Sequence, residues 1–202
     1  MKDIVLLGDR NPQFVTHREL DAALQLFPRG VTGRWVPTDS VEAGQIGDAD
    51  GVWAVSGTPY RNDENAYAAI SHARTCRQPF LGTCGGFQYA VVEFARNEAR
   101  IEGAAHEETA PTAGVRVVRR LSCSLVGEER QVTAIPGTRL YDLCGPAPFT
   151  GFHWCNYGMA SEYVNRLGAC GLQIAATAED AGVEAVELRD HPFFLATLFQ
   201  PQ

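Results

Sequence analysis

The stretch that decides the fold is PFLGTCGGFQYAVVEFARN, residues 79–97. A short apolar run leads into GTCGG at 82–86, and apolar residues then recur at the spacing of a helix that is buried on one face. This order predicts a buried strand at 79–82 and a helix at 87–97. Cys84 stands at the corner between the two elements.

This corner has the spacing of a nucleophile elbow, a Gly-x-Ser-x-Gly turn here written with cysteine. Side chains at Gly82 and Gly86 would collide where the strand and the helix approach each other. The turn places Cys84 in a strained backbone at a helix N-terminus, which favours a thiolate. The N–H of Gly85 would then face a developing oxyanion. A free cysteine is often only a small buried hydrophobe, but this context favours an active-site residue.

Strands and helices alternate around this corner. The pattern predicts strands at 4–7, 33–37 and 49–60 and helices at 16–27 and 62–76, with Thr16 as the cap of the first helix and either Asn62 or Asp63 as the cap of the second. Such alternation predicts an α/β fold with three layers, a doubly wound and mostly parallel sheet covered by helices on both faces. Sites in these sheets form beyond the carboxyl ends of the strands, which is where Cys84 stands.

The second half of the chain is richer in strands. We expect strands at 114–122, 130–135, 182–188 and 193–199, with a short helix near 161–168 and a hairpin turn within 187–194. No internal repeat or linker divides the sequence, so residues 1–202 are predicted to form a single domain.

Composition excludes several classes of partner. The chain has 202 residues and a net charge of −7 without a Lys/Arg run, so neither nucleic acid nor an anionic membrane is an expected partner. The first residues contain only four consecutive apolar positions, and we expect a cytoplasmic protein. In that compartment the six cysteines are expected to be free thiols rather than disulfides. They lack the spacing of a zinc site, and no metal or cofactor is expected.

Residues 79–97 resemble the nucleophile segment of class I glutamine amidotransferases, most closely that of the C-terminal glutaminase domain of CTP synthases and of related stand-alone proteins. Three more segments agree in order. VSGTPYRNDENAYAAISHAR (55–74) is similar to the oxyanion loop and its helix, ARIEGAAHEET (99–109) to a substrate-binding stretch, and HPFFLATLFQPQ (191–202) to the closing segment. The resemblance implies a flavodoxin-like amidotransferase fold.

The resemblance also implies roles for single residues. Gly57 and Thr58 would donate oxyanion hydrogen bonds together with Gly85. Gln88 and Glu108 would bind substrate, with Glu108 pairing with an amine. As an alternative, Glu108 belongs to a solvated acidic face.

The family pattern is broken at its proton-transfer residues. The family closes with a histidine and a glutamate that complete a Cys-His-Glu triad, and this chain has Gln200 and Gln202. Glutamine does not titrate, and loss of a triad base costs several orders of magnitude in rate. The segment GFHWCNYGM at 151–159 also lacks the family's arginine for a substrate carboxylate, and Pro59 has no N–H to donate.

We therefore expect a site kept for another use. His153 is the first candidate for a replacement base and His106 the second, although histidine packs as well as it reacts. Trp154, Tyr157 and Gln200 complete the expected substrate-binding set. Cys155 and Cys123 could line the pocket, although a buried thiol is more typical for each.

Three functions remain open at this point. The first is a cysteine-dependent C–N hydrolase or acyl transferase that acts on a small amino-acid-like substrate. The second is a catalytically silent protein that binds a small ligand or a partner. The third is a glutaminase subunit that supplies ammonia to a separate synthetase. The expected partners are a small molecule and either such a synthetase or a second copy of the chain.

Overall fold

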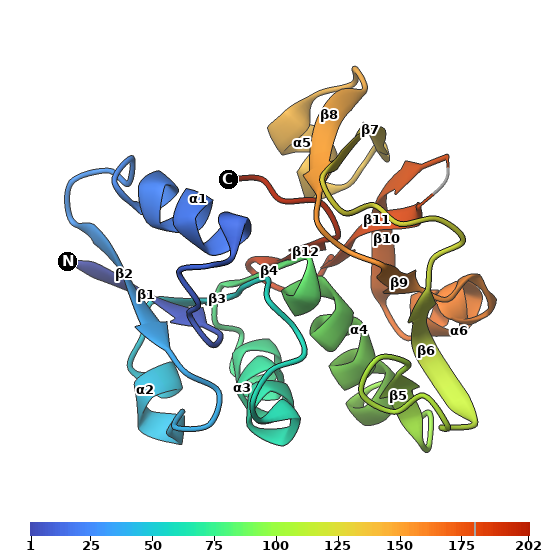
Figure 1. Ribbon diagram of the computed structural model, residues 1–202, viewed down its shortest axis with the longest axis horizontal. Coiled ribbons are helices and arrows are strands. Elements are labelled where there is room, and N and C mark those ends of the chain that lie inside the picture. The colour runs from blue at the N-terminus through green and yellow to red at the C-terminus, as the bar shows by residue number, and fades with distance from the viewer. Residues whose placement is uncertain (180) are drawn as a thin grey trace.

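A nine-stranded sheet runs through the computed structural model, which describes residues 1–179 and 181–202 (Figure 1). The strand order is β2-β1-β3-β4-β12-β11-β10-β7-β8. Its strands are β1 (Lys2–Leu7), β2 (Val31–Val36), β3 (Gly51–Ala54), β4 (Phe80–Thr83), β7 (Glu128–Ala134), β8 (Phe149–His153), β10 (Leu172–Ala178), β11 (Gly182–Leu188) and β12 (Phe194–Thr197). A second sheet has the order β5-β6-β9 and consists of β5 (Ala104–His106), β6 (Val115–Arg120) and β9 (Tyr157–Met159).

The large sheet has a parallel half and an antiparallel half. Strands β2, β1, β3, β4 and β12 pair in parallel, and the pairs from β12 onward to β8 are antiparallel. The predicted doubly wound α/β sheet is confirmed in the first half. The predicted hairpin is confirmed as well, because β11 and β12 pair antiparallel across a short turn.

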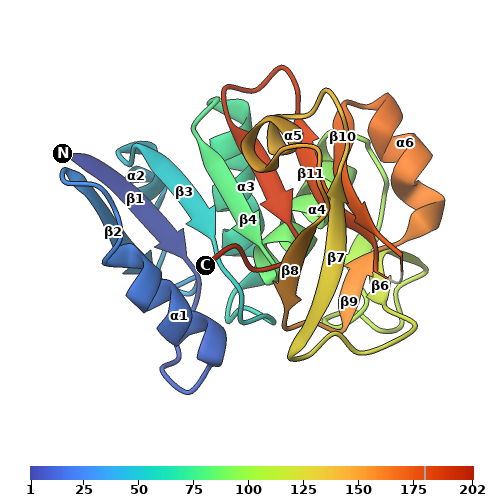
Figure 2. The same cartoon turned by 90° about the horizontal axis from the view of Figure 1, so that it is seen from above.

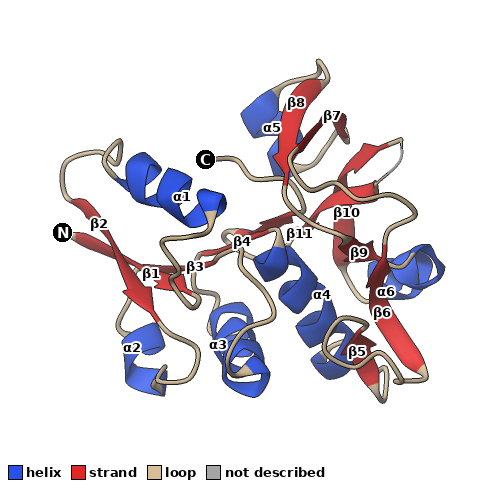
Figure 3. Ribbon diagram, in the orientation of Figure 1, coloured by secondary structure: helices blue, strands red, loops and turns tan. Residues whose placement is uncertain are grey.

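Helices cover both faces of the sheet (Figures 1 and 3). On one face lie α2 (Ala43–Gly47), α3 (Asp63–Thr75) and α4 (Gly85–Asn97), and on the other lie α1 (Val15–Leu24) and α5 (Arg139–Cys144). The predicted short helix near 161–168 forms as a 3-10 turn (Ser161–Tyr163) followed by α6 (Val164–Ala169). None of the helices described is long and apolar enough to cross a membrane.

Helix α4 is the central helix of the molecule. Every residue from Gly85 to Ala95 is buried, because α4 packs against α3, the sheet and the small β5-β6-β9 sheet. A helix that is surrounded by other elements needs mostly apolar residues on all its sides. The N-terminus of α4, with Cys84 beside it, is therefore fixed by the core.

Two predicted caps have different outcomes. The side chain of Asn62 accepts a hydrogen bond from the N–H of Asn65 at 3.0 Å, so the predicted cap of α3 is confirmed. The predicted cap at Thr16 is wrong, because α1 begins at Val15 with Phe14 in the cap position. Thr16 Oγ1 instead accepts a hydrogen bond from Ser56 Oγ at 2.9 Å, which ties α1 to the loop after β3.

Several elements were not expected from the sequence. These are the strands β5, β8, β9 and β10 and the short helices α2 and α5. Strand β8 reaches over the end of the chain, where Phe152 pairs with Gln200. Seen from above, the segment after β12 runs beside β8 toward the C-terminus (Figure 2).

Candidate functional site

The corner after β4 has the geometry of a nucleophile elbow. Cys84 is the N-cap of α4, with φ 52° and ψ −103°. A residue other than glycine at positive φ is strained by about 1–3 kcal/mol. The strained backbone is held from both sides, since the N–H of Cys84 donates to Thr197 O at 2.8 Å and its carbonyl accepts from Gln88 N at 3.2 Å. The predicted strand–cysteine–helix corner is confirmed.

The glycines of the corner are needed for the reason predicted. A Cβ atom on Gly82 would lie 2.8 Å from Gly86 O, and one on Gly86 would lie 2.0 Å from Ala54 O. A Cβ atom on Gly85 would lie 2.3 Å from Cγ2 of Thr58. The strand, the helix and the loop after β3 therefore meet at contact distance around Cys84.

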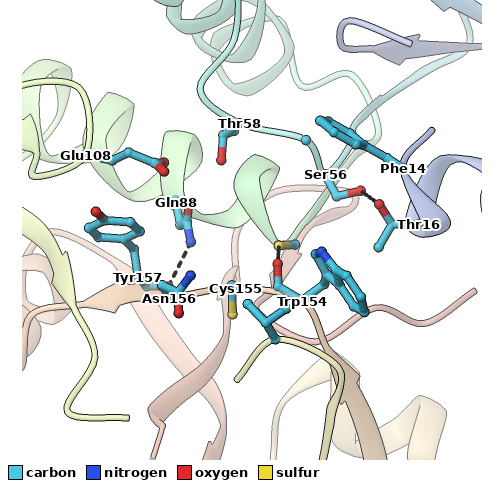
Figure 4. Close-up of a pocket in the computed structure, with 13 residues that line it drawn as sticks. Phe14, Thr16, Ser56, Thr58, Gln88, Glu108, Trp154, Cys155, Asn156 and Tyr157 are labelled. Carbon is cyan, nitrogen blue, oxygen red and sulfur yellow. Dashed lines mark hydrogen bonds between the residues drawn. The ribbon is translucent and has the colours of Figure 1, made fainter. Parts of the chain in front are cut away.

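Cys84 opens into a cavity of about 200 Å³. Figure 4 shows side chains converging on this cavity from two sides, with Phe14, Ser56 and Thr58 opposite Trp154, Asn156 and Tyr157. A volume of this size suits a small metabolite rather than a larger ligand. The lining residues are Phe14, Thr16, Ser56, Gly57, Thr58, Cys84, Gln88, Glu108, Val126, Trp154, Cys155, Asn156 and Tyr157.

One wall of the cavity is the loop that resembles the oxyanion loop. Gly57 has φ 94°, and a Cβ atom there would lie 2.6 Å from His17 Nε2. His17 is fully buried beneath this loop; its Nδ1 accepts a hydrogen bond from Asn11 N at 2.9 Å, and its Nε2 donates to Ser56 O at 2.9 Å. Burial lowers the pKa of His17 and favours this neutral form. His17 therefore positions the loop.

A chain of hydrogen bonds fixes Gln88 in the cavity. The N–H of Glu108 donates to His106 Nδ1 at 3.0 Å, so Nε2 carries the ring proton and donates to Gln88 Oε1 at 3.0 Å. Gln88 Nε2 in turn donates to Tyr157 O at 2.7 Å. Burial lowers the pKa of His106 to about 4. Both ring nitrogens of His106 are occupied, so the structure supports a positioning role for it and does not support the predicted base.

Glu108 presents a carboxylate to the cavity. The side chain is half-buried, and burial together with the negative charge of Asp63 raises its pKa. Within the described residues, its carboxylate oxygens make no hydrogen bond or ion pair, so they are available to a ligand. This placement agrees with the predicted amine-binding role, which stays a prediction.

His153 lies behind the cavity lining. It is fully buried, and its Nε2 lies 2.9 Å and 3.0 Å from the two carboxylate oxygens of Glu184, which is also fully buried. Its Nδ1 has no hydrogen-bond partner in the described structure. Sequence reasoning missed Glu184, although a charged residue in the apolar run of β11 was a usable signal. The role of His153 as a base stays a prediction.

The segment after His153 forms the second wall. Cys84 Sγ donates to the carbonyl oxygen of Trp154 at 3.6 Å, and the dashed line to Trp154 in Figure 4 marks this contact. Cys155 is buried beside it, and its pKa is raised first by a hydrogen bond with Cys84 and then by burial. Trp154 and Tyr157 line the cavity as expected.

Gln200 is not among the lining residues. It is buried, its N–H donates to Phe152 O at 2.8 Å, and its Oε1 accepts from Gln202 Nε2 at 2.8 Å. These two glutamines, predicted from the resemblance to replace the family's histidine and glutamate, therefore bond to each other, and that replacement stays a prediction. Gly85 also lies outside the lining, and its part in an oxyanion hole stays a prediction. Among the residues described, no cluster of His, Cys, Asp or Glu could hold a metal ion.

Comparisons with known proteins agree with this architecture. The family model described as "Glutamine amidotransferase class-I" matches residues 20–199. A CTP synthase of Halobacterium salinarum is 36% identical over 198 residues, covering 92% of this chain and 35% of the relative. A CTP synthase of Aeropyrum pernix is 35% identical over 185 residues, covering 83% and 34%. The chain thus spans about a third of the length of these relatives.

A solved structure shows the same fold. The Trypanosoma brucei CTPS glutaminase domain with bound acivicin superposes with a TM-score of 0.88, covering 100% of this chain and 86% of that chain. The identity is 23%, so this likeness concerns the fold. A glutamine amidotransferase from Thermotoga maritima has a TM-score of 0.62 at 11% identity, covering 98% and 75%.

Proposed function

Because this chain belongs to the class I glutamine amidotransferase family, we propose that Cys84 attacks an electrophilic carbon of a small amino-acid-like molecule. The reaction is C–N bond hydrolysis or acyl transfer. The observation that carries the proposal is the strained elbow, which holds Cys84 at φ 52° against the cavity. Strain of this kind persists only where the surrounding structure maintains it.

The chemical step follows from a cysteine nucleophile. The Cys84 thiolate attacks the carbonyl carbon of a carboxamide, and the carbonyl electron pair moves to oxygen. The N–H groups of Gly57, Thr58 and Gly85 stabilise that oxyanion. Its collapse breaks the C–N bond, the amine leaves with the proton that His153 took from the thiol, and the acyl group stays on sulfur. Water or a second amine then cleaves the thioester and restores the thiol.

The cavity favours a ligand with an amino group. Glu108 supplies a carboxylate that has no partner among the described residues, and a carboxylate of this kind pairs with an ammonium. Gln88 supplies a side-chain amide, and Trp154 and Tyr157 supply aromatic surface. No arginine or lysine is among the described lining residues, so a substrate carboxylate would have no ion pair. The substrate class is therefore a small amine-bearing carboxamide rather than a dicarboxylate.

We assign His153 as the base that removes the proton of the Cys84 thiol. Glu184 holds its Nε2, which leaves Nδ1 as the basic nitrogen. Replacing His153 with Gln should slow the reaction of Cys84 with alkylating agents. Unchanged alkylation would assign His153 to positioning Trp154 and Cys155 instead.

A second candidate function is a catalytically silent binding protein. It is favoured by one observation, that the thiol of Cys84 donates to a backbone carbonyl and not to a titratable group. A third, the supply of ammonia to a separate synthetase, is suggested by the CTP synthases to which the chain is similar. The pairing of Gln200 with Gln202 weighs against it, because neither side chain shuttles a proton.

Two measurements on the same protein separate these functions. The first is covalent labelling of Cys84 by acivicin, an electrophilic amino acid, read by peptide mass spectrometry. The second is ammonia release from a panel of small carboxamides. The proposal predicts both a Cys84 adduct and release that disappears in Cys84→Ala but persists in Cys144→Ala, an exposed-cysteine control. Amino acids that raise the melting temperature without adduct or release would establish the silent binding protein.

A further inference from the structure

Two cysteines from distant parts of the chain line the same cavity. Cys84 and Cys155 are each 5% exposed, whereas the other four cysteines are exposed and all six are free. The proposed reaction uses only Cys84. The second thiol therefore has no part in the chemistry derived above.

The two thiols are in reach of one another. Cys84 Sγ donates to the carbonyl oxygen of Trp154 at 3.6 Å. In a trans peptide unit that oxygen lies on the same side as the Cα of the next residue, and the next residue is Cys155. Cys84 and Cys155 also both line the cavity. A disulfide needs its Cβ atoms about 3.8 Å apart, a separation that the backbone sets, and rotation about χ1 then brings the two sulfurs together.

The two positions differ in environment. Cys84 stands at the N-terminus of a thirteen-residue helix, where the helix dipole stabilises negative charge. Cys155 is held as a neutral thiol by burial and by its neighbours. A reactive cysteine beside a resolving one is the arrangement of thiols that are oxidised reversibly.

We propose that Cys84 and Cys155 form a reversible disulfide when the protein meets a hydroperoxide, and that this bond blocks the cavity's nucleophile. The proposal goes beyond the function given above and does not rest on turnover. A protein that only binds its ligand would form the same bond.

The oxidation balances with hydrogen peroxide as the oxidant. The Cys84 thiolate attacks one peroxide oxygen, the O–O bond breaks, and Cys84 becomes a sulfenic acid while hydroxide leaves and takes up the proton lost by the thiol. The sulfur of Cys155 then attacks the Cys84 sulfur. The S–O bond breaks, and hydroxide leaves with the Cys155 proton. Two thiols and one peroxide thus give one disulfide and two waters.

The test is mass spectrometry of the full chain after treatment with hydrogen peroxide and then trypsin without reductant. Cleavage at arginine places Cys84 in the peptide Gln78–Arg96 and Cys155 in Leu140–Arg166, which also contains Cys144. The experiment therefore uses Cys144→Ser alongside the unaltered chain. We expect these two peptides to be linked in both proteins, with both thiols lost together and recovered by dithiothreitol.

Cys155→Ser supplies the decisive comparison. Without the resolving thiol, Cys84 should accumulate as sulfinic acid, which dithiothreitol does not reverse. The proposal is overturned if Cys144→Ser, which retains both cavity thiols, shows no link between the two peptides after peroxide treatment. This result does not depend on Cys155→Ser, so it stands even if that variant folds poorly. Labelling by acivicin, tested separately, can fail without affecting this result.

Discussion

Cys84 has a positive φ angle, a backbone conformation that residues other than glycine rarely adopt. Gly82 lies against Gly86 O, and Gly86 lies against Ala54 O, with no room for a side chain at either position. The N–H of Cys84 donates to Thr197 O. The strain is therefore maintained by three strands and one helix. A side chain added at the tightest contact has no room, because backbone atoms form the obstacle.

Replacing Gly86 with Ala tests this contact. The new Cβ would lie 2.0 Å from a backbone oxygen, so we expect a loss of about 3 kcal/mol or more in the free energy of unfolding. The matched control is Gly168→Ala in α6, where no atom lies within 4 Å and alanine should stabilise the helix by up to about 1 kcal/mol. Urea unfolding measures both. Equal stability of the two variants would refute the packing argument.

His106 predicts a pH dependence. Burial lowers its pKa to about 4 in the folded chain, below the value near 6.5 of an unfolded histidine. The unfolded state therefore binds more protons between these values. The contribution of His106 to the free energy of unfolding is therefore complete above about pH 6.5. It declines as the pH falls and is lost below about pH 4, a change of about 3 kcal/mol.

The comparison is between the unaltered chain and His106→Gln, each unfolded by urea at several pH values. His17 and His191 also have lowered pKa values, and both remain in the variant, so the difference isolates His106. We expect a shallower loss of stability between pH 6.5 and 4 in His106→Gln. The same slope in both proteins would show that His106 does not stay neutral in the fold.

At the scale of elements, α3 and α4 are joined by a buried ion pair. Arg74 donates three hydrogen bonds to the carboxylate of Glu93, whose side chain is fully buried. Asn97 donates a further hydrogen bond to the same carboxylate. Removing one partner of a buried pair leaves the other charge uncompensated.

We predict that Glu93→Gln lowers the free energy of unfolding by roughly 3 kcal/mol. This is near the lower end of the losses seen when a buried ion pair is broken, because Arg74 retains its ion pair with Glu98. Lys2→Gln, which removes an exposed pair with Asp50, should leave stability nearly unchanged. Thermal unfolding checks both variants. A loss as small for Glu93→Gln as for Lys2→Gln would contradict the account.

The elements that could be predicted from sequence are those with strong local signals. Asn62 before an apolar-periodic segment identified α3, and GTCGG at 82–86 identified the elbow. The missed strands lack such signals: β8 reads FTGFH with a central glycine, and β10 reads LQIAATA with three alanines. Alanine favours a helix, and only pairing with β11 and β7 makes β10 a strand.

At the scale of the whole molecule, the pairing of β4 with β12 joins the strands from the first half of the chain to those from the second half. Phe80 and Phe194 stack across this junction with ring centroids 4.5 Å apart, and both are fully buried. The sheet is therefore continuous from β2 to β8. This continuity supports the prediction of a single domain and predicts one cooperative unfolding transition.

Phe194→Ala tests the junction. We expect a loss of about 3–5 kcal/mol, because a buried aromatic ring and its stacking partner are removed together. Leu143→Ala, at a side chain that is 64% exposed, should change stability by less than about 0.5 kcal/mol. Tryptophan fluorescence and far-UV circular dichroism should report the same transition. Two separate transitions would show that the halves fold independently.

The lining of the site could be predicted, but its internal contacts could not. Cys84 was assigned from a local pattern, Gly57 and Glu108 were assigned from the family resemblance, and all three line the cavity. The contacts of His153 with Glu184, 31 residues apart, and of Cys84 with Trp154, 70 residues apart, depend on how β8 folds over β12. A single sequence does not specify such distances.

The central claim, that Cys84 is an activated nucleophile, is tested most directly by the alkylation rate of each cysteine against pH. A small agent such as iodoacetamide and peptide mass spectrometry report all six thiols in one experiment, so the other five are internal controls. The account predicts that Cys84 reacts faster than the other five thiols, despite being buried. A Cys84 that reacts no faster than Cys144 or Cys170 at any pH would contradict it.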